Sequence, residues 1–261
     1  MLQRYSAFLL DVDGVLVRGN QPLPGTTGAL EELKARGRVV LLTNNSTRSR
    51  AETARRLSQL GLAVSPEEVV TSSYVAARYL RDKFGPSRVW VVGEEGLREE
   101  LSLAGHTLVD PERADWIVAG MDRELSYRKL CLALQGLLAG ARFLATNRDA
   151  TFPTSEGLLP GAGATVGAIE GMGFPPEQVV GKPSPVAYQI ALEVAGVPPK
   201  EALMIGDRLE TDILGAQRVG IDTCLVLSGI SRREDVARSG IKPTWLTKDI
   251  VTLVRGQLLE P

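Results

Sequence analysis

The chain has 261 residues, of which 44% are hydrophobic and 23% are charged, a balance typical of a globular protein long enough for two domains. Its 30 basic and 31 acidic side chains give a formal net charge of −1 without a long run of either sign. This balance argues against binding to nucleic acid or to an anionic membrane surface. The chain has no signal-like start and no apolar run of roughly 18 residues, so we expect neither export nor a membrane span.

The cysteine content is low. Cys131 and Cys224 are far apart in the sequence, which favours neither a disulfide framework nor a cysteine-based metal site. We therefore expect the protein in a reducing cytoplasm. The sequence leaves a homo-oligomer open.

Strands and helices are expected to alternate along the first third of the chain. Continuous apolar runs favour buried strands of a parallel sheet, and apolar residues at helical spacing favour helices between them. This pattern predicts an α/β fold with right-handed crossovers. The expected strands are residues 7–10, 39–42 and 69–71, and the expected helices are residues 26–36, 51–60 and 73–84.

A second alternating unit is expected after the break at Gly85-Pro86-Ser87. We predict a Rossmann-like core domain of residues 1–81 and 179–261, with residues 82–178 inserted as a smaller α/β domain. The insert should contain strands 89–92, 107–109, 116–119 and 143–145 and helices 97–103, 126–138 and 161–172. The core should resume with strands 179–180, 202–205 and 223–227 and helices 185–194 and 212–219.

Two carboxylates follow the first predicted strand. Asp11 and Asp13 lie two residues apart, and Gly14 lets the chain turn away after them. In open α/β sheets the carboxyl edge of the strands is where ligands bind. Two acids on the same side of an extended chain repel each other unless a cation or a shared proton lies between them. A solvated turn is the alternative interpretation of this segment alone.

Further polar residues follow other predicted strands of the same sheet. Each one alone could be a turn, a helix cap or a surface residue. Together they would place a hydroxyl, an amide, an ammonium and several carboxylates at one edge, which suits a phosphoryl group and Mg²⁺. They are Thr43, Asn44, Lys182, Asp207 and Asp212.

These segments resemble the four motifs of the haloacid dehalogenase superfamily, and the resemblance covers nearly the whole chain. It is closest to the NagD-like, 4-nitrophenylphosphatase-like branch of class IIA phosphatases. A further likeness lies in residues 146–149, although Arg148 stands where many members have proline. The motifs are Asp11-Val12-Asp13-Gly14-Val15, Thr43-Asn44-Asn45, Gly181-Lys182-Pro183 and Gly206-Asp207-Arg208-Leu209-Glu210-Thr211-Asp212-Ile213.

The resemblance implies roles for the two acids of the first motif and their neighbours. Asp11 would be the nucleophile that forms an aspartyl-phosphate, and Asp13 the general acid and base. Thr43 and Asn44 would hold phosphoryl oxygens. Lys182 would offset the negative charges that meet when a phosphate dianion approaches a carboxylate.

The resemblance also implies a Mg²⁺ site. Its ligands would be a carboxylate oxygen of Asp11, the backbone carbonyl of Asp13 and the carboxylate of Asp207, with waters completing the octahedron. Asp212 would support this loop rather than bind the metal.

The insert falls between Asn44 and Lys182, the position of a C2-type cap in this superfamily. We therefore expect a Mg²⁺-dependent phosphatase with a lid that selects its substrate. The candidate substrates are small phosphomonoesters: sugar phosphates, nucleoside monophosphates, phosphoglycolate or aryl phosphates. A phosphotransferase with the same intermediate and a non-catalytic regulatory protein that binds Mg²⁺ and phosphate are the alternatives.

Within the insert, Asn147 and Asp149 are the candidates for substrate selection, because they follow a predicted strand at an edge where loops bind ligands. The alternative is that both residues only cap a turn. Arg148 could pair with an acidic group of the substrate.

Overall fold

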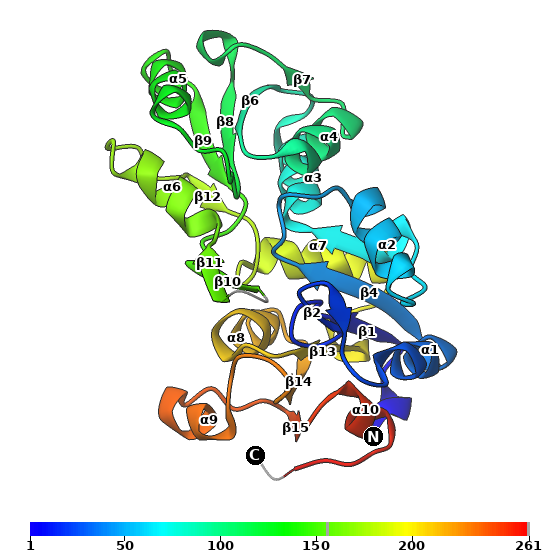
Figure 1. Cartoon of the computed structure of the whole chain (residues 1–261). Coiled ribbons are helices and arrows are strands. Elements are labelled where there is room, and N and C mark those ends of the chain that lie inside the picture. The colour runs from blue at the N-terminus through cyan, green and yellow to red at the C-terminus, as the bar shows by residue number, and fades with distance from the viewer. Residues whose placement is uncertain (155–156, 260–261) are drawn as a thin grey trace. The chain divides into compact units, whose positions relative to one another are not determined.

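The computed structural model describes residues 1–154 and 157–259 and divides the chain into two compact units (Figure 1). Unit 1 contains the beginning and the end of the chain, and unit 2 contains most of the middle. Unit 1 comprises Met1–Thr43, Ala54–Val70 and Lys182–Pro261, and unit 2 comprises Asn44–Thr53 and Thr71–Gly181. The longer stretch of unit 2 runs from Thr71 to Gly181, and within it helix α3 (Ser72–Phe84) packs against α4 (Glu95–Leu103). The assignment of residues 82–178 to a lid stays a prediction.

Unit 1 is built on a six-stranded sheet in the order β15-β14-β13-β1-β4-β5. The pairs of β1 with β4 and β13, and of β14 with β13 and β15, are parallel, which confirms the expected Rossmann-like α/β fold. The strands are β1 (Ala7–Leu10), β4 (Arg38–Thr43), β5 (Val69–Thr71), β13 (Ala202–Gly206), β14 (Asp222–Val226) and β15 (Trp245–Thr247).

Helices connect these strands. A small hairpin of β2 (Val17–Arg18) and β3 (Gln21–Pro22) follows β1, and α2 (Arg50–Gln59) begins in unit 2 and ends in unit 1. Short 3₁₀ turns lie at Leu2–Arg4, Pro66–Glu68 and Pro199–Glu201. The remaining helices are α1 (Thr26–Arg36), α7 (Pro185–Ala195), α8 (Leu214–Gln217), α9 (Arg233–Ser239) and α10 (Ile250–Val254).

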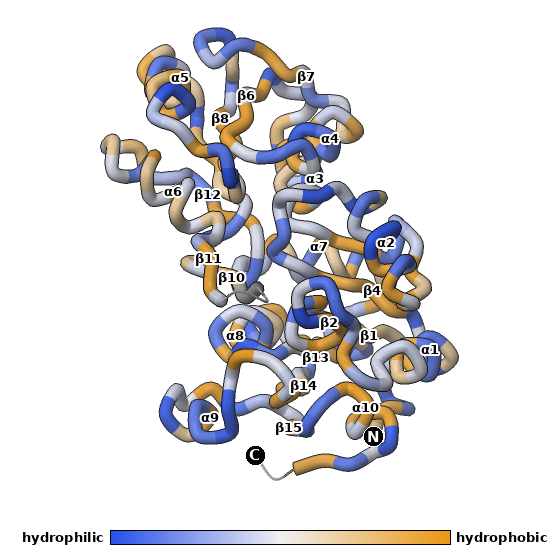
Figure 2. Tube along the Cα trace, viewed as in Figure 1, coloured by the Kyte–Doolittle hydropathy of each residue, from blue (hydrophilic) through white to orange (hydrophobic). Residues whose placement is uncertain are grey.

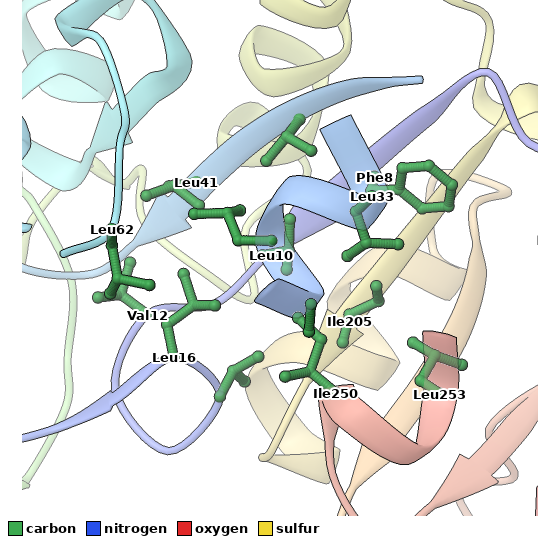
Figure 3. Close-up of a cluster of buried hydrophobic side chains, with 14 of the residues drawn as sticks. Phe8, Leu10, Val12, Leu16, Leu33, Leu41, Leu62, Ile205, Ile250 and Leu253 are labelled. Atoms are coloured by element: carbon green, nitrogen blue, oxygen red, sulfur yellow. The ribbon is translucent and has the colours of Figure 1, made fainter. Parts of the chain in front are cut away.

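The core of unit 1 lies between the sheet and its helices. Leu10 and Ile205 from the central strands pack with Leu33 of α1 and Leu253 of α10, and all four side chains are fully buried (Figure 3). Hydrophobic residues run along β4, whereas α2 is mostly hydrophilic (Figure 2). The centre of the sheet is therefore closely packed and apolar, and this packing fixes the positions of the strand ends, where the polar residues lie.

Unit 2 is a second α/β layer structure with a parallel five-stranded sheet in the order β12-β9-β8-β6-β7. Its core includes Ile117, Phe143 and Val166. Besides α3 and α4, its helices are α5 (Tyr127–Leu138) and α6 (Ala162–Glu170), and a 3₁₀ turn lies at Pro111–Arg113. The strands are β6 (Arg88–Val92), β7 (Thr107–Leu108), β8 (Trp116–Ala119), β9 (Arg142–Ala145) and β12 (Gln178–Val179), and an antiparallel hairpin joins β10 (Thr151–Thr154) to β11 (Gly157–Pro160).

The expected helix over residues 212–219 differs in the structure. Leu209–Ile213 form a wide turn in which the N–H of Ile213 donates to the carbonyl of Arg208, and only Leu214–Gln217 are α-helical. The side chain of Asp212 turns back to accept hydrogen bonds from the main-chain N–H groups of Asp207 and Arg208. This contact competes with regular α-helical geometry. Wide turns of this π type often occur at functional sites.

Candidate active site

Three carboxylates and one ammonium group meet at the carboxyl edge of the unit 1 sheet. Asp11 directly follows β1, Asp207 directly follows the neighbouring strand β13, and Asp212 lies in the turn beyond it. One carboxylate oxygen from each acid lies within 4.8 Å of the other two. Lys182 Nζ donates to Asp11 Oδ1 at 2.6 Å and to Asp212 Oδ1 at 2.7 Å. The structure thus brings together four residues from three segments that are far apart in the sequence.

Both oxygens of Asp212 are occupied by donors from the protein. Oδ1 accepts from Lys182, and Oδ2 accepts from the N–H groups of Asp207 and Arg208 at 3.1 and 3.0 Å. In addition, the hydroxyl of Tyr188 donates to the carbonyl of Thr211 at 2.5 Å and anchors the same turn. This geometry suits a carboxylate that holds the Asp207 loop and Lys182 in position.

Asp207 is bound on one side only. Its Oδ2 accepts from the N–H of Ile230 at 2.7 Å, while Oδ1 is buried and has no hydrogen-bond partner among the residues the structure describes. A Cβ on Gly229 would lie 1.9 Å from Oδ2, so only glycine fits there. The turn of Ser228, Gly229 and Ile230 was not predicted from the sequence. Gly229, shortly after the predicted strand 223–227 and at the same sheet edge, could have indicated this turn.

The acid cluster fits a divalent cation. A buried carboxylate oxygen without a donor is costly unless a cation or a proton compensates it, and Asp207 Oδ1 is such an atom. Carboxylate oxygens are the ligands that Mg²⁺ and Ca²⁺ prefer. Gly14, with φ +88°, lets the turn after Asp13 pass close to Asp207, since a Cβ there would lie 2.4 Å from Asp207 Oδ2. Asp11 and Asp207 therefore offer buried carboxylate oxygens that suit a divalent cation, and the expected ligand set that also includes the main-chain carbonyl of Asp13 stays a prediction.

Burial shifts the pKa values of this cluster. It raises the pKa of Asp11 well above its usual value, although the Lys182 charge opposes that shift. Burial, followed by the charge of Asp212, raises the pKa of Asp207 to about 7. Burial alone would lower the pKa of Lys182, but Asp11 and Asp212 raise it instead, so this lysine stays protonated. A further positive charge would favour the ionised form of both aspartates.

Asp13 and Thr43 belong to the same unit. Asp13 is half-buried in a tight turn in which the N–H of Gly14 donates to the carbonyl of Val17 at 2.8 Å. Thr43 is buried at the end of β4, two residues beyond Leu41, the register partner of Leu10 on β1. It therefore lies near the level of the Asp11 loop along the sheet edge. The catalytic role of Asp13 and the phosphate-binding role of Thr43 stay predictions.

Asn44 is the first residue of unit 2 and contacts the 146–149 loop there. Its Nδ2 lies 3.2 and 3.1 Å from the two carboxylate oxygens of Asp149, and Asn147 Nδ2 donates to its main-chain carbonyl at 2.8 Å. Arg148, in the same loop, forms an ion pair with Glu170 at 2.6 Å. The substrate-selecting role expected for Asn147 and Asp149 stays a prediction.

Comparison with protein families identifies the class of protein. A model of haloacid dehalogenase-like hydrolases matches residues 8–107, and a model of HAD-like hydrolases matches residues 179–253. The acid sugar phosphatase of Staphylococcus aureus is 35% identical over 250 residues, which are 95% of this chain and 96% of that protein. The chain therefore belongs to the haloacid dehalogenase superfamily and is a phosphomonoester hydrolase.

Solved structures identify the branch. A 4-nitrophenylphosphatase from Thermotoga maritima is 34% identical, with a TM-score of 0.92 and coverage of 98% of both chains. A glycerol phosphate phosphatase from Mycobacterium tuberculosis, solved in complex with calcium, is 35% identical with a TM-score of 0.89 and coverage of 97% of this chain and 75% of that one. The expected assignment to the class IIA, NagD-like phosphatases is confirmed.

The helices were also compared with the requirements for spanning a bilayer. Among residues 1–154 and 157–259, none combines the length and the apolar character that a membrane-crossing helix needs.

Proposed function

We propose that this phosphatase is Mg²⁺-dependent and hydrolyses small phosphomonoesters through an aspartyl-phosphate on Asp11. The observation that carries the proposal is the position of Asp11 at the edge of the sheet, hydrogen-bonded to the buried ammonium of Lys182 and with a carboxylate oxygen within 4.8 Å of one from Asp207. A carboxylate beside a fixed cation can accept a phosphoryl dianion that it would otherwise repel.

In the first half-reaction a carboxylate oxygen of Asp11 attacks phosphorus, and the bond from phosphorus to the ester oxygen breaks. Asp13 gives its proton to the departing alkoxide, which leaves as an alcohol. Lys182 offsets the charge that accumulates on the phosphoryl oxygens, while Thr43 and Asn44 hold those oxygens in place.

In the second half-reaction Asp13 takes a proton from a water molecule, whose oxygen attacks the phosphorus of the aspartyl-phosphate. The bond from phosphorus to Asp11 breaks, inorganic phosphate leaves, and the Asp11 carboxylate is restored. Asp212 keeps Lys182 in position through both steps.

Asp11, Asp207 and the backbone carbonyl of Asp13 would hold the Mg²⁺. When bound there, Mg²⁺ supplies positive charge that neutralises the phosphoryl group and the carboxylates.

Substrate choice is assigned to residues 82–178, because the core residues can recognise only the phosphoryl group and the metal that all monoesters share. The names of the acid sugar phosphatase and glycerol phosphate phosphatase relatives support a sugar or polyol phosphate. Nucleoside monophosphates, phosphoglycolate and aryl phosphates complete the candidate panel. The unpaired thiols of Cys131 and Cys224 support the proposal of a reducing, cytoplasmic environment.

The test is to trap the intermediate with a phosphate-labelled substrate and acid quenching. The wild-type protein should retain label on Asp11, and Asp11→Asn should retain none and lose at least about four orders of magnitude in turnover. Circular dichroism should show that the variant is folded. Turnover near the wild-type rate would contradict the assignment of the nucleophile.

The phosphotransferase alternative shares the first half-reaction. Adding a simple alcohol and comparing the alkyl phosphate formed with the inorganic phosphate released separates the two. We expect inorganic phosphate to dominate.

A further inference from the structure

The 146–149 loop of unit 2 contains a buried amide that is hydrogen-bonded at both ends. Asn147 is only 1% exposed. Its Nδ2 donates to the carbonyl of Asn44 at 2.8 Å, and its Oδ1 accepts from the N–H of Asp149 at 3.1 Å. A side chain with both ends engaged and almost no exposed surface is not suited to bind the variable part of a substrate.

Asn44 is held by several partners in the same unit. Ser72 Oγ donates to its carbonyl at 2.8 Å, in addition to the bond from Asn147. A carboxylate can only accept hydrogen bonds here, so the NH₂ end of the Asn44 amide must face Asp149. A Cβ on Gly181 would lie 2.7 Å from Asn44 Oδ1, which shows how closely the backbone passes the other end of this amide.

We propose that Asn147 and Asp149 are positioning residues that fix Asn44 for phosphate binding, rather than residues that select the substrate. The inference rests on the proposed function, in which Thr43 and Asn44 hold the phosphoryl oxygens. Asn44 directly follows Thr43, the last residue of β4, and the Asn147 and Asp149 contacts fix the main chain and the amide of Asn44 within unit 2. The group being positioned serves every phosphomonoester equally.

This role makes a different prediction from substrate selection. A residue that contacts the leaving group changes the ranking of substrates when it is altered. A residue that positions the phosphate site lowers kcat/KM for all substrates by a common factor and weakens the binding of inorganic phosphate.

The experiment compares Asp149→Ala, Asp149→Asn and Asn147→Ala with the wild-type enzyme at saturating Mg²⁺. For both alanine variants kcat/KM should fall roughly tenfold or more, the usual effect of losing a hydrogen bond to a charged or buried group. The factor should be the same for an aryl phosphate, a sugar phosphate and a nucleoside monophosphate. The inhibition constant of inorganic phosphate should rise, and Asp149→Asn, which can still accept one bond from Asn44, should retain more activity.

Arg148→Ala is the matched control. Arg148 lies in the same loop, but its guanidinium donates to the carboxylate of Glu170 and not to Asn44. Because its guanidinium is paired with Glu170 and an aryl phosphate offers no acidic group besides the phosphate, the pairing with the substrate considered from the sequence does not apply here. The removal of Arg148 should therefore leave kcat/KM for the aryl phosphate within about twofold. A comparable loss in this variant would mean that any disturbance of the loop is sufficient, which would overturn the specific roles of Asn147 and Asp149.

A double-mutant cycle with Asn44→Ala makes the test stricter. If Asp149 acts through Asn44, adding Asp149→Ala to Asn44→Ala should cost little more, whereas independent roles would give multiplied losses. A changed substrate ranking with an unaltered aryl phosphatase rate, multiplied losses, or wild-type behaviour of both alanine variants would each overturn the proposal. Failure of the proposed function would show separately, as wild-type turnover in Asp11→Asn.

Discussion

Each unit contains a buried aspartate near a lysine, and the two differ in how their oxygens are satisfied. In unit 2, Asp122 accepts from Lys129 Nζ through both oxygens, at 2.9 and 2.7 Å, and from the N–H of Glu124. In unit 1, Asp207 Oδ1 has no donor among the described residues, and the nearby Lys182 bonds Asp11 and Asp212 instead. A buried carboxylate whose oxygens all accept hydrogen bonds is accounted for by the fold. A buried carboxylate oxygen without a donor indicates a binding site for a cation or another ligand.

Removal of the metal should have the largest effect, because we expect the metal to bind Asp207 and not Asp122. Chelation with EDTA should abolish phosphatase activity, Mg²⁺ should restore it, and Ca²⁺ should support it poorly because its coordination is less strict. At a hundredfold excess over its Kd, Mg²⁺ should also stabilise the wild-type fold by about 2.7 kcal/mol, measured by thermal unfolding.

Two substitutions locate that metal effect. Asp207→Asn should lose the stabilisation by Mg²⁺, and the matched Asp122→Asn should keep it, since both oxygens of Asp122 accept from Lys129, whereas Asp207 Oδ1 has no donor in the part of the chain that the structure describes. Full activity in a thoroughly chelated sample, or an equal Mg²⁺ response in both variants, would refute the metal assignment.

Lys182→Ala should produce the next largest effect. Because Lys182 bridges Asp11 and Asp212, its loss removes the positive charge beside the nucleophile, and turnover should fall by roughly two to three orders of magnitude. Steady-state kinetics with an aryl phosphate measures this. A loss below about tenfold would place Lys182 outside the phosphate site.

Lys129→Met should affect stability and not chemistry. It leaves the Asp122 carboxylate, 1% exposed as a side chain, without its cation, which should lower the free energy of unfolding by about 1–3 kcal/mol. Activity towards an aryl phosphate should stay within about twofold. Denaturant unfolding and initial rates test both statements. If the unpaired charge of Asp122 causes the loss, the double variant Lys129→Met with Asp122→Asn should regain stability. A double variant as unstable as Lys129→Met alone would contradict this explanation.

The smallest effect concerns His106 in unit 2. Its Nδ1 accepts from the N–H of Ser87, and its Nε2 therefore carries the proton that is donated to the Ala77 carbonyl. Burial lowers its pKa below the usual 6.5, and the nearby Arg81 charge acts in the same direction. The unfolded chain thus binds its proton first as the pH falls, so stability should decrease below about pH 6.5.

Unfolding of wild type and His106→Gln at about pH 7.5 and about pH 5.5 tests this dependence. The wild type should lose more stability than the variant over that interval. Identical losses would mean that other groups cause the pH dependence.

Most helices and strands before residue 227 were predictable because long apolar runs and helical periodicity are local signals. The short strands β2, β3, β10 and β11 were not predicted. The strand expected over 179–180 in the core sheet is β12, which pairs with β9 in the sheet of unit 2. The strand β1 and the helix α1 appear where the sequence places them. The elements α9, β15 and α10 escaped prediction, since each has seven residues or fewer and a weak pattern. The helix expected over 212–219 failed because Asp212 bonds the preceding loop, a contact that no local propensity encodes.

The motifs were sufficient to predict the family, and the apolar runs before them placed Asp11 and Asp207 at the ends of strands. Parallel strands bring their carboxyl ends to one edge, so Asp11 and Asp207 had to be neighbours once β1 and β13 were adjacent. Only the tertiary structure decided which partner each polar atom has. Hydrogen bonds depend on distances of a few tenths of an ångström between segments far apart in the chain, and periodicity carries no information about them. The structure was therefore needed to show that Lys182 bridges two acids and that Asn147 and Asp149 hydrogen-bond to Asn44. It was also needed to show that Asp207 Oδ1 has no donor among the residues described.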